Sequence, residues 1–430
     1  MSPSPRRYRR KLRIAVAAVV AVVLFWFFVV ALMPYRHELR RAVPPGTPAC
    51  DPQFARDMAG LYGSAIISGN RITTLVNGDA IFAAMLEAIG EAERSITFET
   101  YIYWTGAIAE RFCDALIDRV KAGVRVKVLI DWAGSLPMSD DLIDRMHENG
   151  VELRMFRPMR LRTLTRLNNR THRKILVVDG KLGFIGGVGI ADEWCGDARN
   201  PGEWRDTHYR VAGPIVAMLQ NAFAHNWVEA HGEVLRGDAF YPELAPQGDT
   251  ALQLVKSNTG SRNEIHLMMM TALAGAERHI RISTPYFVPD NVVMDQLLQA
   301  RKRGIRVDLM LAARQNDSVL VRRVSRRSWR KLLEAGVHIH EFTPTFLHAK
   351  LLIVDECWAS FGSANFDERS FRLNDEANLN VYDEAVVAEQ IGLFNADLAR
   401  SRPVTIADLD RIGWLTHAQD IVLSILKPHL

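Results

Sequence analysis

Short apolar runs alternate with amphipathic stretches along most of the chain, from about residue 65 to residue 410. The runs at 95–102 and 279–287 are mostly apolar and rich in β-branched and aromatic residues, which is typical of strands. Apolar residues at helical spacing in 108–123 and 292–304 predict helices between the strands. Strands that alternate with helices predict an α/β fold whose sheet is covered on both faces.

The alternating pattern occurs twice in the same order, which indicates a duplicated lobe. Three pairs of segments resemble each other: 92–103 and 276–287, 121–131 and 302–312, and 148–156 and 334–342. A His-x-Lys sequence then follows in each copy, at His172 and at His348, 176 positions apart. We therefore predict two α/β lobes, 65–235 and 236–410, packed with pseudo-twofold symmetry.

The N-terminal region differs in composition from the lobes. Residues 1–13 are basic, and residues 14–33 are uncharged and apolar, which is long enough to span a bilayer. A cleaved signal peptide is the alternative, but its apolar core is usually shorter and a cleavage site of small residues follows it. More Lys and Arg precede the span than follow it, which predicts an N-terminus inside and catalytic lobes on the outer face of a bacterial cytoplasmic membrane. A Pro-containing linker at 34–64 and an amphipathic tail at 411–430 complete the predicted organisation.

The net charge and the cysteine content say less about what this protein binds than its sequence motifs do. The formal net charge is only +4 over 430 residues, so the total predicts no strong field for nucleic acid. The four cysteines are far apart and lack the spacing of a zinc or redox motif. We interpret them as buried or incidental thiols, with a disulfide as the alternative if the lobes face an oxidising compartment.

The His-x-Lys sequences carry the chemistry. Side chains two apart on a strand point to one face, so His172 lies beside Lys174, and His348 beside Lys350. If the lobe symmetry brings the strand ends together, two imidazoles and two ammonium groups share one pocket. Two lysines suit the oxygens of a phosphodiester, one imidazole can attack phosphorus, and the other can transfer protons.

Such a division of labour requires a carboxylate that fixes each imidazole. The candidates are Glu376, 28 residues beyond His348, in one lobe, and Asp206, 34 residues beyond His172, in the other. We predict no metal and no cofactor.

The motif H-x-K-x4-D followed by G-S-x-N resembles the signature of the phospholipase D superfamily. THRKILVVD and LHAKLLIVD both match its first part, and TPYFVPDN and GSANFDERSFRLNDE are most similar to bacterial cardiolipin synthases. The resemblance implies two α/β lobes, a covalent phosphohistidine intermediate, no metal, and exchange of a phosphatidyl group between alcohols. It assigns the catalytic motif to these residues: His172, Lys174, Asp179, His348, Lys350 and Asp355.

The tails of the two motif copies differ. Gly362, Ser363 and Asn365 match the second tail and are candidate substrate-binding residues, whereas Gly187 and Gly189 replace the expected Ser and Asn of the first. We therefore expect phosphate binding to be asymmetric and to depend on Asn365 and on backbone amides.

The aspartates of the motif are expected to have another role than the histidines. Strand alternation puts Asp179 and Asp355 on the face away from His and Lys, which predicts a structural role. The resemblance favours His172 as the nucleophile and His348 as the acid and base, although the sequence leaves this assignment open.

The predicted function is cardiolipin formation from phosphatidylglycerol at an anionic membrane. The alternatives are a phospholipase D-type hydrolase, a nuclease and an inactive membrane adaptor. Two basic stretches, 154–174 and 322–331, are expected to orient the lobes on anionic lipid, or else are solvated helix faces. No oligomeric state or protein partner is predicted.

The loop at 191–206 has a tryptophan near each end, Trp194 and Trp204. Tryptophan favours the membrane interface, so we predict a lid or a lipid-touching flap beside the pocket.

Overall fold

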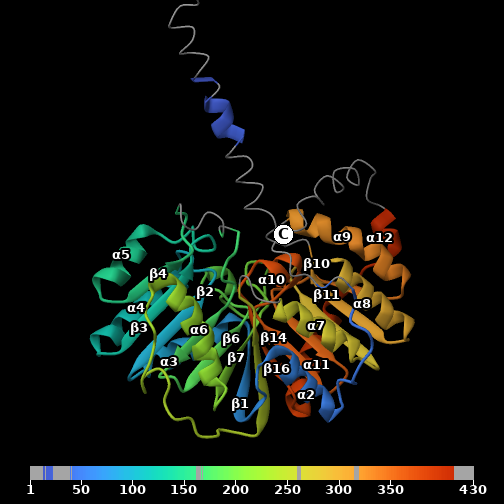
Figure 1. Ribbon diagram of the computed structural model, residues 1–430, viewed down its shortest axis with the longest axis horizontal. Coiled ribbons are helices and arrows are strands. Elements are labelled where there is room, and N and C mark those ends of the chain that lie inside the picture. Colours follow the sequence, from blue (N-terminus) through green and yellow to red (C-terminus); the bar gives the residue numbers. More distant parts are fainter. Residues whose placement is uncertain are drawn as a thin grey trace, which may run out of the picture.

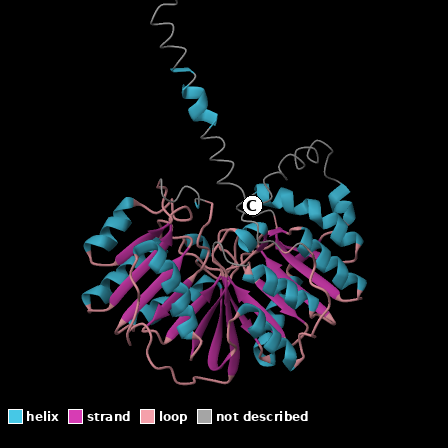
Figure 2. Ribbon diagram, in the orientation of Figure 1, coloured by secondary structure: helices cyan, strands magenta, loops and turns pink. Residues whose placement is uncertain are grey.

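The computed structural model describes residues 13–14, 16–22, 39, 41–160, 166, 168–258, 263–313 and 319–410, without the side chains of 319–324. Strands and helices alternate through both halves, and helices cover the strands from both sides (Figures 1 and 2). The predicted mixed α/β fold is confirmed.

The described strands join into one sheet whose two halves have the same order. From the centre outwards, the first half contains β1 (Ile67–Val76), β7 (Thr207–Ala212), β6 (Leu182–Gly186), β5 (Ile175–Val178), β2 (Ser95–Thr100), β3 (Arg125–Asp131) and β4 (Glu152–Phe156). The second half contains β8 (Thr250–Lys256), β16 (Ala377–Val381), β14 (Trp358–Gly362), β13 (Leu351–Val354), β9 (His279–Thr284), β11 (Arg306–Ala312), β12 (His338–Phe342) and β17 (Ser401–Pro403). A small separate sheet pairs β10 (Phe287–Val288) with β15 (Phe366–Asp367). The repeated order agrees with the duplication that the sequence predicts.

In each half several helices cover one face of the sheet and a single long helix covers the other. The helices of the first half are α3 (Asn77–Gly90), α4 (Ala107–Lys121), α5 (Asp140–Glu148) and α6 (Val216–His231). Those of the second are α7 (Glu264–Ala274), α8 (Asn291–Lys302), α9 (Val319–Glu334), α10 (Glu368–Arg372), α11 (Glu384–Ala399) and α12 (Ile406–Asp410). Ile96 and Phe98 of β2 pack with α3 and α4, while the alternate residue Thr97 bonds Gln220 of α6. The strands are thus buried on both faces, as their nearly continuous apolar runs require.

The two halves also meet through their central strands. β1 and β8 pair irregularly at Ile67 with Leu252 and at Asn70 with Thr250. The ring of Tyr209 on β7 stacks on Phe361 of β14, with ring centroids 3.6 Å apart. One apolar cluster includes residues of both halves, so the junction is part of the core.

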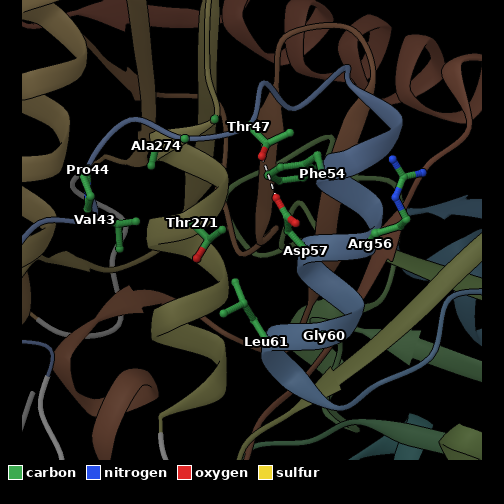
Figure 3. A pocket seen from close by; sticks show the side chains of 12 residues that line it. Val43, Pro44, Thr47, Phe54, Arg56, Asp57, Gly60, Leu61, Thr271 and Ala274 are labelled. Atoms are coloured by element: carbon green, nitrogen blue, oxygen red, sulfur yellow. Dashed lines mark hydrogen bonds between the residues drawn. The ribbon is translucent and has the colours of Figure 1, made fainter.

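The segment before the first lobe is not only a linker, because it contains α2 (Pro52–Tyr62). Asp51 caps this helix through the backbone N–H of Gln53, and Phe54 and Met58 are buried in the core of the second half. A cavity of about 440 Å³ lies between α2, residues 43–47 and α7 (Figure 3). None of the motif residues lines this cavity.

Two cysteines form a disulfide, which corrects their interpretation as incidental thiols. Cys50 precedes α2, and Cys357 lies in the turn between β13 and β14, with Cα atoms 5.3 Å apart. Cys113 and Cys195 are free. The sequence could not reveal the pair because 307 residues separate its members.

Within the described part of the chain, no helix is both long enough and apolar enough to cross a bilayer. Of the predicted span 14–33, only residues 14 and 16–22 are described, and they are helical. Residues 1–12 of the basic segment and the whole tail 411–430 lie outside the described residues.

We predict that loss of the disulfide destabilises the protein. A disulfide that closes a long loop typically contributes about 2–4 kcal/mol by restricting the unfolded chain. Differential scanning calorimetry of a Cys50→Ser, Cys357→Ser double variant should therefore show a lower Tm than that of the wild type. Reductant should lower the Tm of the wild type and leave that of the double variant unchanged; equal Tm values would contradict a structural disulfide.

Candidate active site

The two His-x-Lys segments come together where the halves of the sheet meet. Each segment precedes an equivalent strand, β5 in the first half and β13 in the second. Backbone hydrogen bonds tie each segment to the opposite half: His172 N to Asp375 O (2.9 Å), Asp375 N to Arg170 O (2.9 Å), Arg205 N to Phe346 O (2.9 Å) and His348 N to Arg205 O (2.7 Å). The residues just before β7 and β16 are therefore in contact with the motif of the other half.

Each motif histidine pairs with a carboxylate of the other half. His172 Nδ1 lies 3.0 Å from Glu376 Oε1, and His348 Nδ1 lies 2.8 Å from Asp206 Oδ2. Both proposed carboxylates are therefore at the site, but the expected pairing within one lobe is wrong. The backbone exchange explains this, because it lays residues 375–376 beside His172 and residues 205–206 beside His348.

Both carboxylates are fully enclosed and have further donors. Glu376 Oε2 accepts a hydrogen bond from the Ser363 hydroxyl at 2.5 Å. Asp206 accepts from the backbone N–H of Thr207 at 2.8 Å and from the Trp194 indole N–H at 3.0 Å. Burial opposes ionisation, but the contacts with the histidines prevail: they lower the pKa of Glu376 to about 2 and hold that of Asp206 below its usual value.

The imidazoles are neutral at pH 7 in this environment. His172 is 8% exposed and His348 is 4% exposed, and burial disfavours the charged form of both. Burial, together with the ammonium group of Lys174, lowers the pKa of His172 to about 4 despite Glu376. Burial and Lys350 lower that of His348 to about 3 despite Asp206. With the carboxylate ionised, each Nδ1 donates its proton and each Nε2 carries a lone pair. The Nε2 atom of His348 lies 3.2 Å from the Lys350 ammonium nitrogen.

The two lysines flank the imidazoles. Lys174 donates to the carbonyl oxygen of His172, and Lys350 donates to that of His348, each at 2.7 Å. Burial and the proximity of Lys350 lower the pKa of Lys174 to about 7. The ammonium of Lys174 also lies 5.4 Å from the ring centroid of Tyr101, whose ring packs on His172. An anion between the lysines would relieve their mutual repulsion, so the site favours a negatively charged ligand.

The glycine-rich tails of the two motifs differ in their polar groups. Asn365 is buried, and its Oδ1 has no hydrogen-bond partner among the described residues. The backbone amides of Ala364 and Asn365 already donate, to Asn378 Oδ1 and to the Ser370 hydroxyl. In the first tail, a Cβ on Gly189 would lie 2.8 Å from Ile102 Cβ, so a side chain could not be accommodated there without a shift.

Other residues of the motif hold the backbone. Gly362 allows two strands to approach closely, because a Cβ at this position would lie 2.2 Å from the Ala377 carbonyl oxygen. The Asp179 carboxylate accepts three backbone N–H bonds from residues 93–95, and Asp355 accepts three from residues 277–279. Both aspartates have positive φ, so each fixes a tight turn against the start of a parallel strand. This placement agrees with the structural role expected from strand alternation.

The loop at 191–206 lies beside the site, but it is not a lipid-touching flap at Trp194. This side chain is 1% exposed and packs edge-on against His348, with centroids 5.1 Å apart. Trp204 is half-buried and packs between Trp194 and Phe346. The preference of tryptophan for membrane interfaces suggested exposure, whereas these rings form a wall of the site.

Several basic side chains of the stretches 154–174 and 322–331 are buried or ion-paired, so fewer of them are available to contact lipid than the sequence suggests. The buried Lys and Arg side chains of 154–174 are those of Arg157, Arg170, Arg173 and Lys174. Arg157 pairs with Glu229, and Arg173 donates to the carbonyl oxygens of Ala222 and Ser257. Arg173 thus connects the two halves, and these four buried side chains are not exposed at the surface. In 322–331, Arg326 pairs with Glu341, and Arg330 pairs with Asp410.

Sequence reasoning missed the residues that support the histidines from outside the motifs. Arg205, which precedes Asp206, is buried and pairs with Asp397 at 2.8 Å. Trp194 bonds Asp206, as described above. The sequence contained one indication of the role of Trp194. Gly187 stands where the other motif copy has Ser363, so Asp206 lacks the hydroxyl donor that Glu376 has and needs a donor from elsewhere.

The crossed pairing predicts which histidine each carboxylate controls. A Glu376→Gln change removes the charge beside His172 and should alter the pKa and tautomer of His172 while His348 stays unchanged. Asp206→Asn should do the reverse. Histidine-selective ¹⁵N NMR, with signals assigned from His172→Ala and His348→Ala, would measure this; effects within the same lobe would contradict the pairing.

Comparisons with known proteins agree with this geometry. Residues 85–195 and 269–398 match the family model described as cardiolipin synthase, PLD-like domain. Cardiolipin synthase 2 of Bacillus cereus is 37% identical over 335 residues, which are 77% of this chain and 65% of that protein. The chain thus spans about two thirds of that relative's length. The major cardiolipin synthase ClsA of Bacillus subtilis is 34% identical over 84% of this chain and 76% of its own.

Solved structures share the fold at low sequence identity. A phosphatidylserine synthase from Haemophilus influenzae superposes with a TM-score of 0.67 at 14% identity, over 88% of this chain and 100% of that one. A polyphosphate kinase from Porphyromonas gingivalis gives 0.53 at 12% identity, over 79% and 49%. Both motif copies, the paired half-sheets and these matches lead to one conclusion: the chain belongs to the cardiolipin synthase family of PLD-like proteins.

Proposed function

We propose that this protein is a phosphatidyltransferase that forms cardiolipin and glycerol from two molecules of phosphatidylglycerol. The observation that carries the proposal is the pair of buried, neutral imidazoles, each held by an ionised carboxylate and flanked by a lysine. This arrangement suits double displacement at a phosphodiester, and relatives named cardiolipin synthase support phosphatidylglycerol as the substrate.

In the first step His172 Nε2 attacks the phosphorus of one phosphatidylglycerol. The bond from phosphorus to the glycerol headgroup breaks, and His348 gives a proton to the leaving glycerol oxygen. Lys174 and Lys350 neutralise the charge on the non-bridging oxygens, with the Asn365 amide as a further ligand of the phosphate.

In the second step His348 removes a proton from the headgroup hydroxyl of a second phosphatidylglycerol. That oxygen attacks the phosphohistidine, the P–N bond breaks, and cardiolipin leaves with His172 restored. His348 must be protonated when the first step begins. An anionic phosphodiester placed between the histidines favours the imidazolium form, so binding of the substrate itself promotes this protonation.

We also propose a location for the protein, which two features support. Residues 14–33 serve as a membrane anchor that keeps the lobes close to lipid, and a disulfide persists in oxidising compartments. Together they support catalytic lobes on the outer face of the cytoplasmic membrane. The exposed arginines that remain in 154–174 assist contact with anionic lipid.

The purified, detergent-solubilised protein should convert phosphatidylglycerol into equal amounts of cardiolipin and glycerol, measured by mass spectrometry. His172→Ala and His348→Ala should each lower kcat by about 10⁴-fold or more, because the residues act as a unit. His338→Ala, which removes an exposed imidazole that pairs with Asp308, is the matched control.

Other product patterns distinguish the alternatives. Phosphatidic acid in place of cardiolipin would mean that water resolves the intermediate and that the enzyme is a hydrolase. A phosphohistidine trapped in His348→Ala and absent from His172→Ala supports His172 as the nucleophile; the opposite result would exchange the two roles.

The pH dependence of phosphodiester binding should reflect the free enzyme. Binding requires a charged Lys174, so the affinity for an unreactive phosphodiester analogue, measured by isothermal titration calorimetry, should be lost as pH rises through the Lys174 pKa of about 7. A profile that stays flat up to the ordinary lysine pKa of about 10.4 would contradict this assignment.

A further inference from the structure

The two halves hold their carboxylates with different donors. In the second half the Ser363 hydroxyl donates to Glu376 and also accepts the backbone N–H of Ala377 at 3.0 Å. The equivalent position in the first half is Gly187, which has no side chain. Asp206 nevertheless has a donor, because the Trp194 indole N–H lies 3.0 Å from its Oδ2.

A serine at Gly187 could not replace this donor in the observed arrangement. A Cβ at that position would lie 2.4 Å from Asp206 Oδ1 and 2.7 Å from Oδ2, so the carboxylate occupies the space. Asp206 is one methylene shorter than Glu376, and its carboxylate therefore lies closer to its own strand. The indole reaches the same carboxylate from a different direction, out of the 191–206 loop.

We propose that Trp194 is a positioning residue for His348, acting through Asp206. Asp206 Oδ2 accepts both the indole N–H and the Nδ1–H of His348, so one oxygen connects the two rings. This inference rests on the proposed function for the part that concerns turnover, because that function makes His348 the acid and base.

The surroundings of Trp194 keep its ring in place. The Asp192 carboxylate accepts the backbone N–H bonds of Ala107 and Ile108 at the start of α4, which anchors the loop. The Trp194 carbonyl lies against Gly78, where a Cβ would approach it to 1.8 Å. The absence of a side chain at Gly78 thus allows the backbone of Trp194 to approach α3 closely.

The indole N–H of Trp194 fixes which partner donates and which accepts in the hydrogen bonds around Asp206. Unlike a serine hydroxyl, it can only donate a hydrogen bond, so Asp206 Oδ2 must face it as an acceptor. Asp206 then accepts the Nδ1 proton of His348, and Nε2 remains available for proton transfer to and from the substrate. Without the indole donor, the carboxylate loses part of its orientation and His348 loses the preference for this tautomer.

The test replaces Trp194 by Phe, which keeps an aromatic ring and removes the N–H. Outer hydrogen-bond partners commonly affect activity by about 10–100-fold, and we expect such a loss in kcat with KM nearly unchanged. Histidine-selective ¹⁵N NMR at pH 7 should show a smaller Nδ1–H fraction for His348 and no change for His172. Ser363→Ala should give the reciprocal result, with a change at His172.

The matched control is Trp227→Phe. Trp227 is also fully buried, and its indole N–H also donates to a carboxylate, that of Glu233, at 2.9 Å. Both substitutions remove the same kind of bond, so a general loss of stability would appear in both. Trp227→Phe should leave the His348 tautomer and kcat at wild-type values.

The outcomes separate the positioning role from the proposed function. An unchanged His348 tautomer in Trp194→Phe, or an equal loss of kcat in Trp227→Phe, would overturn the positioning role. The NMR result does not depend on the reaction, so it stands even if the enzyme makes no cardiolipin. If Trp194→Phe does not fold, benzothienylalanine at position 194 keeps the bicyclic shape and replaces N–H by sulfur, and the same expectations apply.

Discussion

The reciprocal exchange of carboxylates between the two halves is the constraint on which the site depends. Neither half has a complete site, because His172 needs Glu376 and His348 needs Asp206. Backbone hydrogen bonds from each motif segment to the opposite half maintain the exchange, and the shared central core prevents the halves from separating. A duplicated lobe has thus become one unit that cannot be divided without loss of both histidine pairs.

Burial makes this exchange chemically useful. Both imidazoles are largely buried, and the low local dielectric disfavours their charged forms while it strengthens interactions with charge. The site combines two neutral imidazoles with two lysines whose positive charges repel each other. A bound anion would lower this repulsion. In the proposed reaction the phosphodiester would supply the missing negative charge, so that its binding and the protonation of a histidine would be coupled.

Much of the fold and most motif residues could be predicted because the chain repeats one pattern twice. The histidine–carboxylate pairing could not, since Asp206 and Glu376 occupy equivalent places and only tertiary packing decides between the two pairings. Trp194 was misassigned because its general preference for interfaces says nothing about a specific acceptor. The Cys50–Cys357 bond was missed for a similar reason, since its partners meet only when the N-terminal helix α2 packs against the second half.

That bond has a consequence for the order of events during synthesis. Helix α2 precedes every strand of the first half but packs in the core of the second, among residues of α7 and α8. As the chain emerges from its N-terminus, Cys50 appears first, and Cys113 and Cys195 follow long before Cys357. Cys50 must therefore stay unpaired until the second half is synthesised, and burial of Cys113 inside the first half removes one wrong partner in the meantime.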